Sequence, residues 1–226
     1  ASFRLNLKGK MEIFKSREAA GELLANRLKN TKADIVLGIP RGGVVVAAKL
    51  AKDLNLPFDI IVTRKIGAPF QEELALGAVD PDGEVVWDQE LLDELKIKPE
   101  DLKQKIDTEI KELKRREKLY RQGRSPLEVS GKTVILTDDG MATGSTILAA
   151  VKYLKRHGAK IILAVPVTSS GAIQKIENEV DKSIVLQIPE YFQAVGQFYE
   201  QFVPVTDKEV IQCLGSSSVR KKSLAL

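Results

Sequence analysis

The sequence predicts an α/β fold in which helices flank a parallel sheet, and two observations indicate it. Five short apolar runs alternate along the chain with segments whose apolar residues recur at helical spacing. These runs are almost continuously apolar, which is typical of parallel strands buried on both faces. A hydrophobic content of 43% and a charged content of 29% suit a globular domain with a core. We therefore expect a single domain over residues 11–215, with an extension over 1–10 and a flexible tail over 216–226.

Strand–helix units are predicted in the first part of the chain. Ser16 can cap a first helix, because its hydroxyl accepts a hydrogen bond from an N–H group of the first turn. The apolar runs that follow end in Gly-Pro or in polar residues, as buried strands do. The predicted elements are a helix over 17–29, a strand over 34–40, a turn over 40–43, a helix over 44–54, a strand over 58–65 and a loop over 66–73. A hairpin of residues 74–80 and 83–88 follows, with Pro-Asp-Gly at its turn.

Charged residues dominate between residues 89 and 122. Pro99 opens a long predicted helix whose few apolar residues form one stripe at helical spacing. This pattern favours a solvated helix that packs along one side only. Because it lengthens the gap between two strands, we interpret about 89–122 as a helical insertion.

The second half of the chain returns to strand–helix alternation, which extends the parallel sheet. Gly158 is placed to end one of its helices, since glycine adopts the left-handed conformation common just beyond a helix. The predicted elements are a strand over 132–139, a helix over 146–158, a strand over 159–167, a helix over 171–180 and a strand over 183–189.

Composition excludes several kinds of site. Cys213 and His157 are the only residues of their types, so neither a disulfide framework, a cysteine zinc site nor a Ser–His–Asp triad is expected. The net charge of +4 is spread along the chain, which argues against a dedicated nucleic-acid surface. We expect no membrane segment, because no apolar run approaches the roughly 20 residues that a span needs. The first residues also lack an apolar signal core, so we expect a cytoplasmic protein.

The stretch VILTDDGMATGST, residues 134–146, runs from a predicted strand into two acids and a loop of small residues. A small-residue loop that enters a helix exposes backbone N–H groups and hydroxyls to an anion such as phosphate. Loop composition alone is equally compatible with an ordinary strand–turn–helix connection. The acids Asp138 and Asp139 favour a ligand that carries hydroxyls beside its phosphate, since carboxylates accept hydroxyl protons. A sugar phosphate with vicinal hydroxyls fits.

Cationic residues follow the first two predicted strands. Arg41, Gly42 and Gly43 could wrap a second phosphate with backbone amides and a guanidinium, although taken alone an ordinary strand–helix turn with a surface arginine fits equally well. Arg64 and Lys65 end the second predicted strand, and taken alone they are more typical of surface charges at a strand end. Parallel sheets bind ligands beyond the carboxyl ends of their strands, where these groups would meet. Together they indicate a ligand with phosphates at both ends.

Residues 134–146 closely resemble the phosphoribosyl pyrophosphate (PRPP) motif of type I phosphoribosyltransferases, although Gly140 replaces a more common apolar residue. GIPRGG stands where that family has its pyrophosphate loop, and TRK stands where some members begin a flexible loop. The closest resemblance is to poorly characterised phosphoribosyltransferase-like proteins with PRGG, RKIGAP and DDGMATGST motifs. The resemblance implies a Rossmann-like parallel sheet with a small hood. It also implies transfer of the 5-phosphoribosyl group of PRPP to a nitrogenous base or another nitrogen acceptor, with release of pyrophosphate.

The resemblance also implies a role for each matching residue. Asp138 and Asp139 would hold the ribose hydroxyls, Arg41 would bind the pyrophosphate, and Lys65 would clamp it; we predict these four as the catalytic residues. The remaining binding residues would be Gly42, Gly43, Arg64, Gly140, Ala142, Thr143, Gly144, Ser145 and Thr146. Magnesium would be held mainly through PRPP and water, without a dedicated protein metal site. A homodimer and a place in nucleotide metabolism and salvage are implied as well.

The acceptor is not indicated by the sequence. Residues 189–202 are one candidate for the hood, and Phe192, Phe198 or Tyr199 could stack on a base, with core packing as the alternative. Two further functions stay open: a regulatory protein that binds PRPP or a nucleotide without turnover, and a sugar-phosphate hydrolase. The hydrolase lacks an evident nucleophile.

Overall fold

The computed structural model describes residues 13–216. The predicted extension over 1–10 and all but the first residue of the predicted tail lie outside this range. The helices are α1 (Arg17–Leu28), α2 (Gly42–Leu54), α3 (Gln89–Leu95), α4 (Lys103–Arg121), α5 (Ser145–Arg156), α6 (Ser170–Ile176) and α7 (Asp207–Gly215), with the 3-10 helices η1 (Pro99–Leu102) and η2 (Val195–Phe198). The strands are β1 (Ile35–Gly38), β2 (Phe58–Ile60), β3 (Arg64–Ala68), β4 (Gln71–Val79), β5 (Val85–Trp87), β6 (Thr133–Thr137), β7 (Lys160–Val167) and β8 (Lys182–Gln187).

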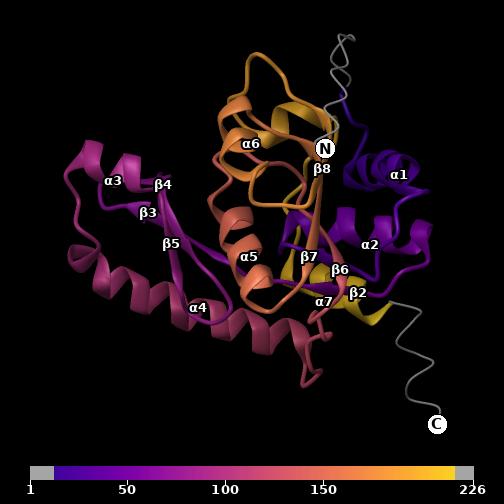
Figure 1. Ribbon diagram of the computed structural model, residues 1–226, viewed down its shortest axis with the longest axis horizontal. Coiled ribbons are helices and arrows are strands. Elements are labelled where there is room, and N and C mark those ends of the chain that lie inside the picture. The colour runs from indigo at the N-terminus through magenta and orange to yellow at the C-terminus, as the bar shows by residue number, and fades with distance from the viewer. Residues whose placement is uncertain (1–12, 217–226) are drawn as a thin grey trace.

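The main sheet confirms the predicted α/β class. Its order is β2-β1-β6-β7-β8 and every pairing in it is parallel. Helices α1 and α2 cover one face, and α5 and α6 cover the other (Figure 1). The connection after β1 leads to β2 on one side, whereas β6 lies on the other side of β1. The gap between β1 and β6 is therefore the point where a doubly wound sheet receives ligands.

Alternate residues of the central strands face opposite layers of the core, because successive side chains of a strand point to opposite faces. Val36 and Ile135 pack with the helices α1 and α2. Their neighbours Ile35 and Val134 pack with α5 and α6 instead. Apolar clusters therefore lie on both faces of these strands, which explains why apolar residues occupy consecutive positions in them.

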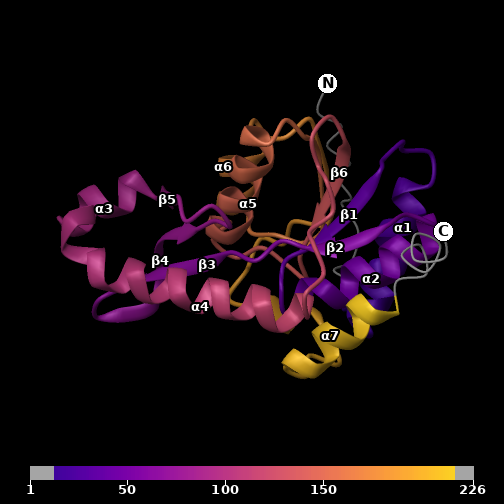
Figure 2. The same cartoon turned by 90° about the horizontal axis from the view of Figure 1, so that it is seen from below.

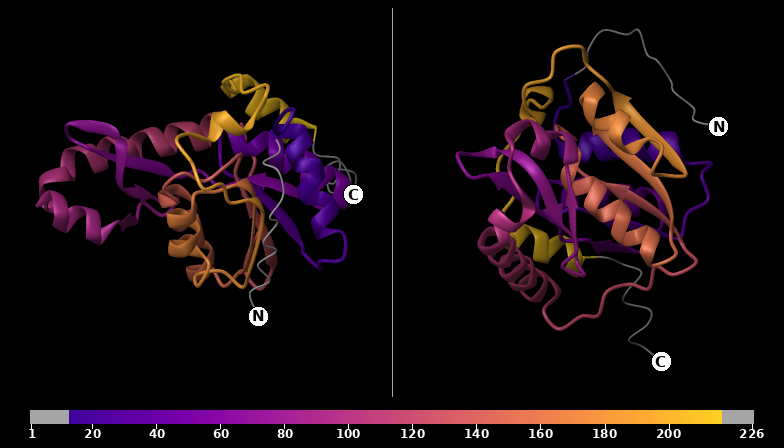
Figure 3. Two further views of the ribbon diagram at one scale, coloured as in Figure 1. Left: turned by 90° about the horizontal axis from the view of Figure 1, so that it is seen from above. Right: turned by 60° about the vertical axis from the view of Figure 1, so that its left-hand side comes forward.

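A second, antiparallel sheet of order β3-β4-β5 projects from the main sheet together with α3 and α4 (Figure 2). Helix α4 runs along this projection, and its carboxyl-terminal half contacts α7, which also contacts α2 (Figure 3). Leu102 and Leu113 of the predicted apolar stripe are buried, as that stripe requires. Helix α4 is thereby joined through α7 to α2, which covers the main sheet.

The second strand is shorter than predicted. It ends at Ile60, which pairs with Gly38, the last residue of β1. A parallel strand cannot continue its ladder beyond the end of its only partner, so the chain leaves the sheet there. Arg64 and Lys65 consequently begin β3 in the other sheet, and the prediction that they end a strand of the main sheet was wrong.

The segment 66–73 was predicted to be a loop, but it forms the turn and the adjoining strand residues of a hairpin of β3 and β4. Its breakers are accommodated by irregular pairing: the register shifts on both sides of Gly67. A Cβ at Gly67 would collide with the backbone of Glu72, so only glycine fits this bulge. The predicted hairpin of β4 and β5 is confirmed. No helix of the described chain is long and apolar enough to cross a membrane.

Candidate functional site

Two neighbouring strands bring the glycine pair and the acid pair together. Gly38 at the end of β1 lies opposite Thr137 at the end of β6, and the Ile39 amide donates a hydrogen bond to the Thr137 carbonyl at 3.0 Å. The chain leaves both strands at the same level, so the segments that follow must meet. Both lie at the carboxyl edge of the sheet, as predicted from the sequence.

Gly42 and Gly43 pack directly on the two acids. A Cβ at Gly42 would collide with the Asp139 carboxylate, and a Cβ at Gly43 would lie 2.7 Å from Asp138 Oδ1. Neither position has room for a side chain, so the glycines are required by close approach. The peptide bond between Pro40 and Arg41 is cis. Arg41 is the N-cap of α2, which begins at Gly42, so the predicted turn is the start of the helix.

The two acids differ in their surroundings. Asp138 accepts a hydrogen bond from the Asp139 amide at 2.8 Å. Burial and the adjacent charge of Asp139 raise the pKa of Asp138 well above its usual value. Asp139 forms an ion pair with Arg17, with 2.8 Å between Oδ2 and Nε. A carboxylate pair of this kind favours ligands that bring hydroxyl donors or a cation.

Residues 140–146 form a small-residue loop at the amino terminus of α5. Gly144 adopts a φ of +82°, and the loop is braced by Ser169, whose hydroxyl donates to the Ala142 carbonyl at 2.7 Å. Within the described chain, the backbone amides of Ala142, Thr143 and Gly144 donate no hydrogen bond. The side chains of Thr143 and Ser145 lie 3.2 Å apart, oxygen to oxygen. Free amides and hydroxyls at a helix amino terminus are suited to bind a phosphate.

A cavity of about 280 Å³ adjoins this loop. It is lined by Thr143, Gly144 and Ser145 on one side and by Trp87 of β5 on another. Lys175 of α6 also lines it and forms an ion pair with Asp88 at 2.5 Å. The projecting sheet thereby borders the phosphate-type loop.

Replacing Gly144 with alanine should weaken both the loop and any anion binding to it. A Cβ there would lie 3.0 Å from Ile176 Cδ1, and the left-handed conformation costs an L-residue about 1–2 kcal/mol. Chemical denaturation and inorganic phosphate titration measure the two effects. The control is Gly171→Ala, because a Cβ added there has no neighbouring atom within 4 Å. Equal behaviour of the two variants would contradict the assigned role of Gly144.

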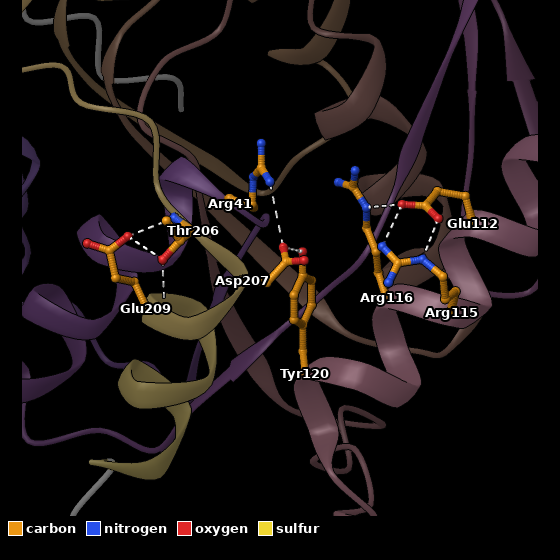
Figure 4. A network of polar contacts seen from close by, with 8 residues as sticks. All are labelled: Arg41, Glu112, Arg115, Arg116, Tyr120, Thr206, Asp207 and Glu209. Atoms are coloured by element: carbon orange, nitrogen blue, oxygen red, sulfur yellow. Dashed lines mark hydrogen bonds and ion pairs between the residues drawn. The ribbon is translucent and has the colours of Figure 1, made fainter.

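Arg41 points from the start of α2 toward the amino terminus of α7. Its Nη1 lies 3.6 Å from Asp207 Oδ1, and Asp207 also accepts a hydrogen bond from the Tyr120 hydroxyl at 2.7 Å (Figure 4). Burial and this bond raise the pKa of Tyr120 to about 12, so the phenol keeps its proton. The Arg41 side chain is 44% exposed, and an ion pair this long and open is weak. Arg41 can therefore exchange Asp207 for a ligand anion.

Arg64 and Lys65 begin β3 of the projecting sheet, shortly after β2 ends. Arg64 pairs with Glu109 of α4 at 2.7 Å, and Lys65 pairs with Glu73 of β4 at 3.1 Å. To bind a ligand anion, each of these cations would have to leave its carboxylate partner.

Aromatic residues of the segment after β8 serve mainly as core. Phe198 and Tyr199 are buried, and Phe192 packs on Phe198 with 5.1 Å between ring centroids. The predicted stacking of Phe198 or Tyr199 on a base is therefore wrong in this structure, and both residues pack in the core, which was the alternative. Tyr199 nevertheless reaches the site, since its hydroxyl donates to the Asp139 carbonyl at 2.5 Å.

Sequence reasoning missed three residues that meet the predicted ones: Arg17, Tyr199 as a hydrogen-bond donor, and Asp207. Arg17 looked like an ordinary first residue of a helix, and only its burial distinguishes it. Asp207 follows Thr206 in a capping-box pattern, which explains it as a helix start without any site. No local pattern indicates any of these contacts.

A sequence model of the phosphoribosyl transferase domain matches residues 7–202. A Mycobacterium tuberculosis protein with the provisional name phosphoribosyl transferase is 40% identical over 90% of this chain. The chain spans about half the length of that curated relative, 47%. The crystal structure of the protein TT1426 from Thermus thermophilus is 36% identical, covers 91% of this chain and 99% of its own, and has a TM-score of 0.76.

The matched domain covers both strand ends and both loops of the site. The edge where β1 and β6 end holds the glycine pair, the acid pair and the small-residue loop, and all three lie within the matched residues. On these grounds the chain belongs to the type I phosphoribosyltransferase family.

Proposed function

We propose that this protein transfers the 5-phosphoribosyl group of PRPP to a nitrogen acceptor and releases pyrophosphate. One observation carries the proposal: the glycine pair after β1 packs directly on the acid pair after β6. A pyrophosphate held at Gly42 and Gly43 would then adjoin a ribose whose hydroxyls reach Asp138 and Asp139. The 5-phosphate would lie on the free amides of residues 142–144.

The residues would act by differential binding. The bond between C1 of the ribose and pyrophosphate breaks as the acceptor nitrogen approaches, so negative charge grows on the leaving group. Arg41 and the amides at the start of α2 would stabilise that charge more in the transition state than in the ground state. Asp138 and Asp139 would fix the ribose, and Arg64 or Lys65 would bind the pyrophosphate after leaving its carboxylate partner.

Magnesium, which the family generally uses with PRPP, would be held mainly by the phosphate oxygens of PRPP and by water, since such hard oxygen donors suit this ion. Bound with PRPP, magnesium would supply positive charge to the leaving pyrophosphate. Among the described residues, no group of three or more His, Cys, Asp or Glu could hold a metal without the ligand.

The alternative, a PRPP- or nucleotide-binding regulatory protein, is favoured by a different observation. All three candidate pyrophosphate cations have carboxylate partners: Asp207 for Arg41, Glu109 for Arg64 and Glu73 for Lys65. A protein that bound PRPP without turnover could leave Arg64 and Lys65 in these pairs, because only turnover needs them to close on the leaving pyrophosphate.

The deciding experiment measures pyrophosphate release with PRPP, magnesium and a panel of purine and pyrimidine bases. We expect release with at least one base and loss of release when magnesium is chelated. Measurable PRPP binding without release for any base would favour the regulatory alternative. Absence of PRPP binding would refute the transferase and the PRPP-binding form of the alternative. Homodimer formation, a role in salvage and a cytoplasmic location stay predictions implied by the family.

A further inference from the structure

We propose that Arg17 is a positioning residue, which holds the Asp139 carboxylate for the ribose and locks the segment Phe202–Val203 beside it. This inference rests on the proposed function, and it concerns a residue outside every motif of the sequence. Helix α1 would then support the site through Arg17. It would do so from far along the chain, since the segment Phe202–Val203 that Arg17 holds lies near the other end of the described residues.

The guanidinium of Arg17 makes two hydrogen bonds and one ring contact with other described residues. Nε donates to Asp139 Oδ2 at 2.8 Å, and Nη1 donates to the Val203 carbonyl at 2.8 Å. The guanidinium carbon lies 4.0 Å from the ring centroid of Phe202, close enough for a cation–π contact. Arg17 is only 8% exposed. Burying a cation has a desolvation cost. The partners of Arg17 offset this cost because they match the planar arrangement of N–H donors on its guanidinium.

Asp139 is held from a second side by the same segment. The Tyr199 hydroxyl donates to its backbone carbonyl, and Tyr199 stacks on Phe202 with 5.2 Å between ring centroids. Phe202 in turn lies against Arg17. These contacts close a ring through the side chain and the main chain of Asp139, so moving any one member displaces the carboxylate.

The position of Arg17 also limits how Asp139 can turn. A Cβ at Gly42 would lie 3.1 Å from Arg17 Nε, so the glycine, the arginine and the carboxylate share one tightly packed volume. Ser16 fixes the start of α1 by accepting a hydrogen bond from the Ala19 amide at 3.3 Å. The helix therefore presents Arg17 to Asp139 from a rigid base.

Three ionisable groups face Asp139: Arg17 from α1, Asp138 from the same loop and Tyr199 from the segment after η2. Burial raises the pKa of Asp139, and Arg17 opposes that rise. Losing Arg17 would raise this pKa further, so the carboxylate would take up a proton at higher pH. The acid limb of PRPP binding would then also move to higher pH, because the ribose hydroxyls would meet a protonated acid.

The test compares the wild type with Arg17→Gln, Arg17→Lys and the control Arg27→Gln, which changes an exposed arginine of the same helix. Two readouts are used: PRPP affinity by calorimetry across the acid range, and titration of ¹³C-labelled aspartate carboxyls by NMR without ligand. Circular dichroism checks that each variant is folded.

We expect Arg17→Gln to lower PRPP affinity about tenfold near neutral pH and to shift both the acid limb and the Asp139 titration upward. Arg17→Lys should restore the titration but only part of the affinity, since it keeps the charge and loses the fork. Arg27→Gln should match the wild type.

A folded Arg17→Gln protein with wild-type affinity would overturn the inference. The inference would also be overturned if Arg17→Gln lost the same affinity at every pH and left the Asp139 titration unshifted. That result would mean that Arg17 only stabilises the structure. If the wild type itself binds no PRPP, the proposed function fails and the inference fails with it. Normal binding by the wild type separates the two failures.

Discussion

Replacing Asp139 with asparagine should weaken PRPP binding by about tenfold or more, because a hydrogen bond to a charged group contributes roughly 1.5–3 kcal/mol. The amide keeps the size of the carboxylate but loses its charge and one acceptor oxygen. Arg17 would lose its ion-pair partner at the same time. Isothermal calorimetry with PRPP and magnesium measures the effect.

The control for this prediction is Asp53→Asn, which removes a carboxylate from the surface pair with Lys49 on α2. It should leave PRPP affinity unchanged. Unchanged affinity in a folded Asp139→Asn protein would remove Asp139 from the site and with it the assignment of the ribose.

Replacing Arg121 with methionine should lower the free energy of unfolding by about 3–5 kcal/mol, because it leaves a buried carboxylate without its cation. Arg121 Nη1 donates to both oxygens of Asp59 at 2.9 and 3.0 Å, and Asp59 is 1% exposed. Arg121 Nη2 also donates to the Ile60 carbonyl. This cluster fastens the end of α4 to β2, so its loss should loosen the projecting part as well. Urea denaturation measures the change.

Arg115→Met supplies the matched control on the same helix. Its pair with Glu112 is exposed, and the denaturation midpoint should scarcely move. A similarly small effect of Arg121→Met would mean that the buried pair does not hold α4 in place.

The main sheet was predictable because its strands carry their own signal. Runs such as residues 161–167 are apolar at every position, and between amphipathic helices such a short run is typical of a buried parallel strand. The extent of β2 was not predictable. Residues 61–63 are as apolar or as buried as those of β2, and only the end of β1 decides where the ladder stops. The β3–β4 hairpin was not predictable either, because residues that usually interrupt a strand are accommodated here by an irregular pairing around Gly67.

The candidate site was predictable where one segment carries it. Asp138, Asp139 and the loop after them stand together in the sequence, and parallel-sheet topology then brings Gly42 and Gly43 to them. Arg17 could not be found in this way, since 122 residues separate it from Asp139. The ion-pair partner of Arg64 could not be predicted for the same reason, because Glu109 lies on a helix that no local pattern connects to Arg64.

The central claim is that the ends of β1 and β6 together form one PRPP site. A crystal structure of the protein with PRPP and magnesium tests it most directly. The account predicts the 5-phosphate on the amides of residues 142–144, the ribose hydroxyls at Asp138 and Asp139, and the pyrophosphate at Arg41, Gly42 and Gly43. PRPP bound elsewhere, for example in the cavity beside Trp87 and Lys175 with the acid pair untouched, would contradict it.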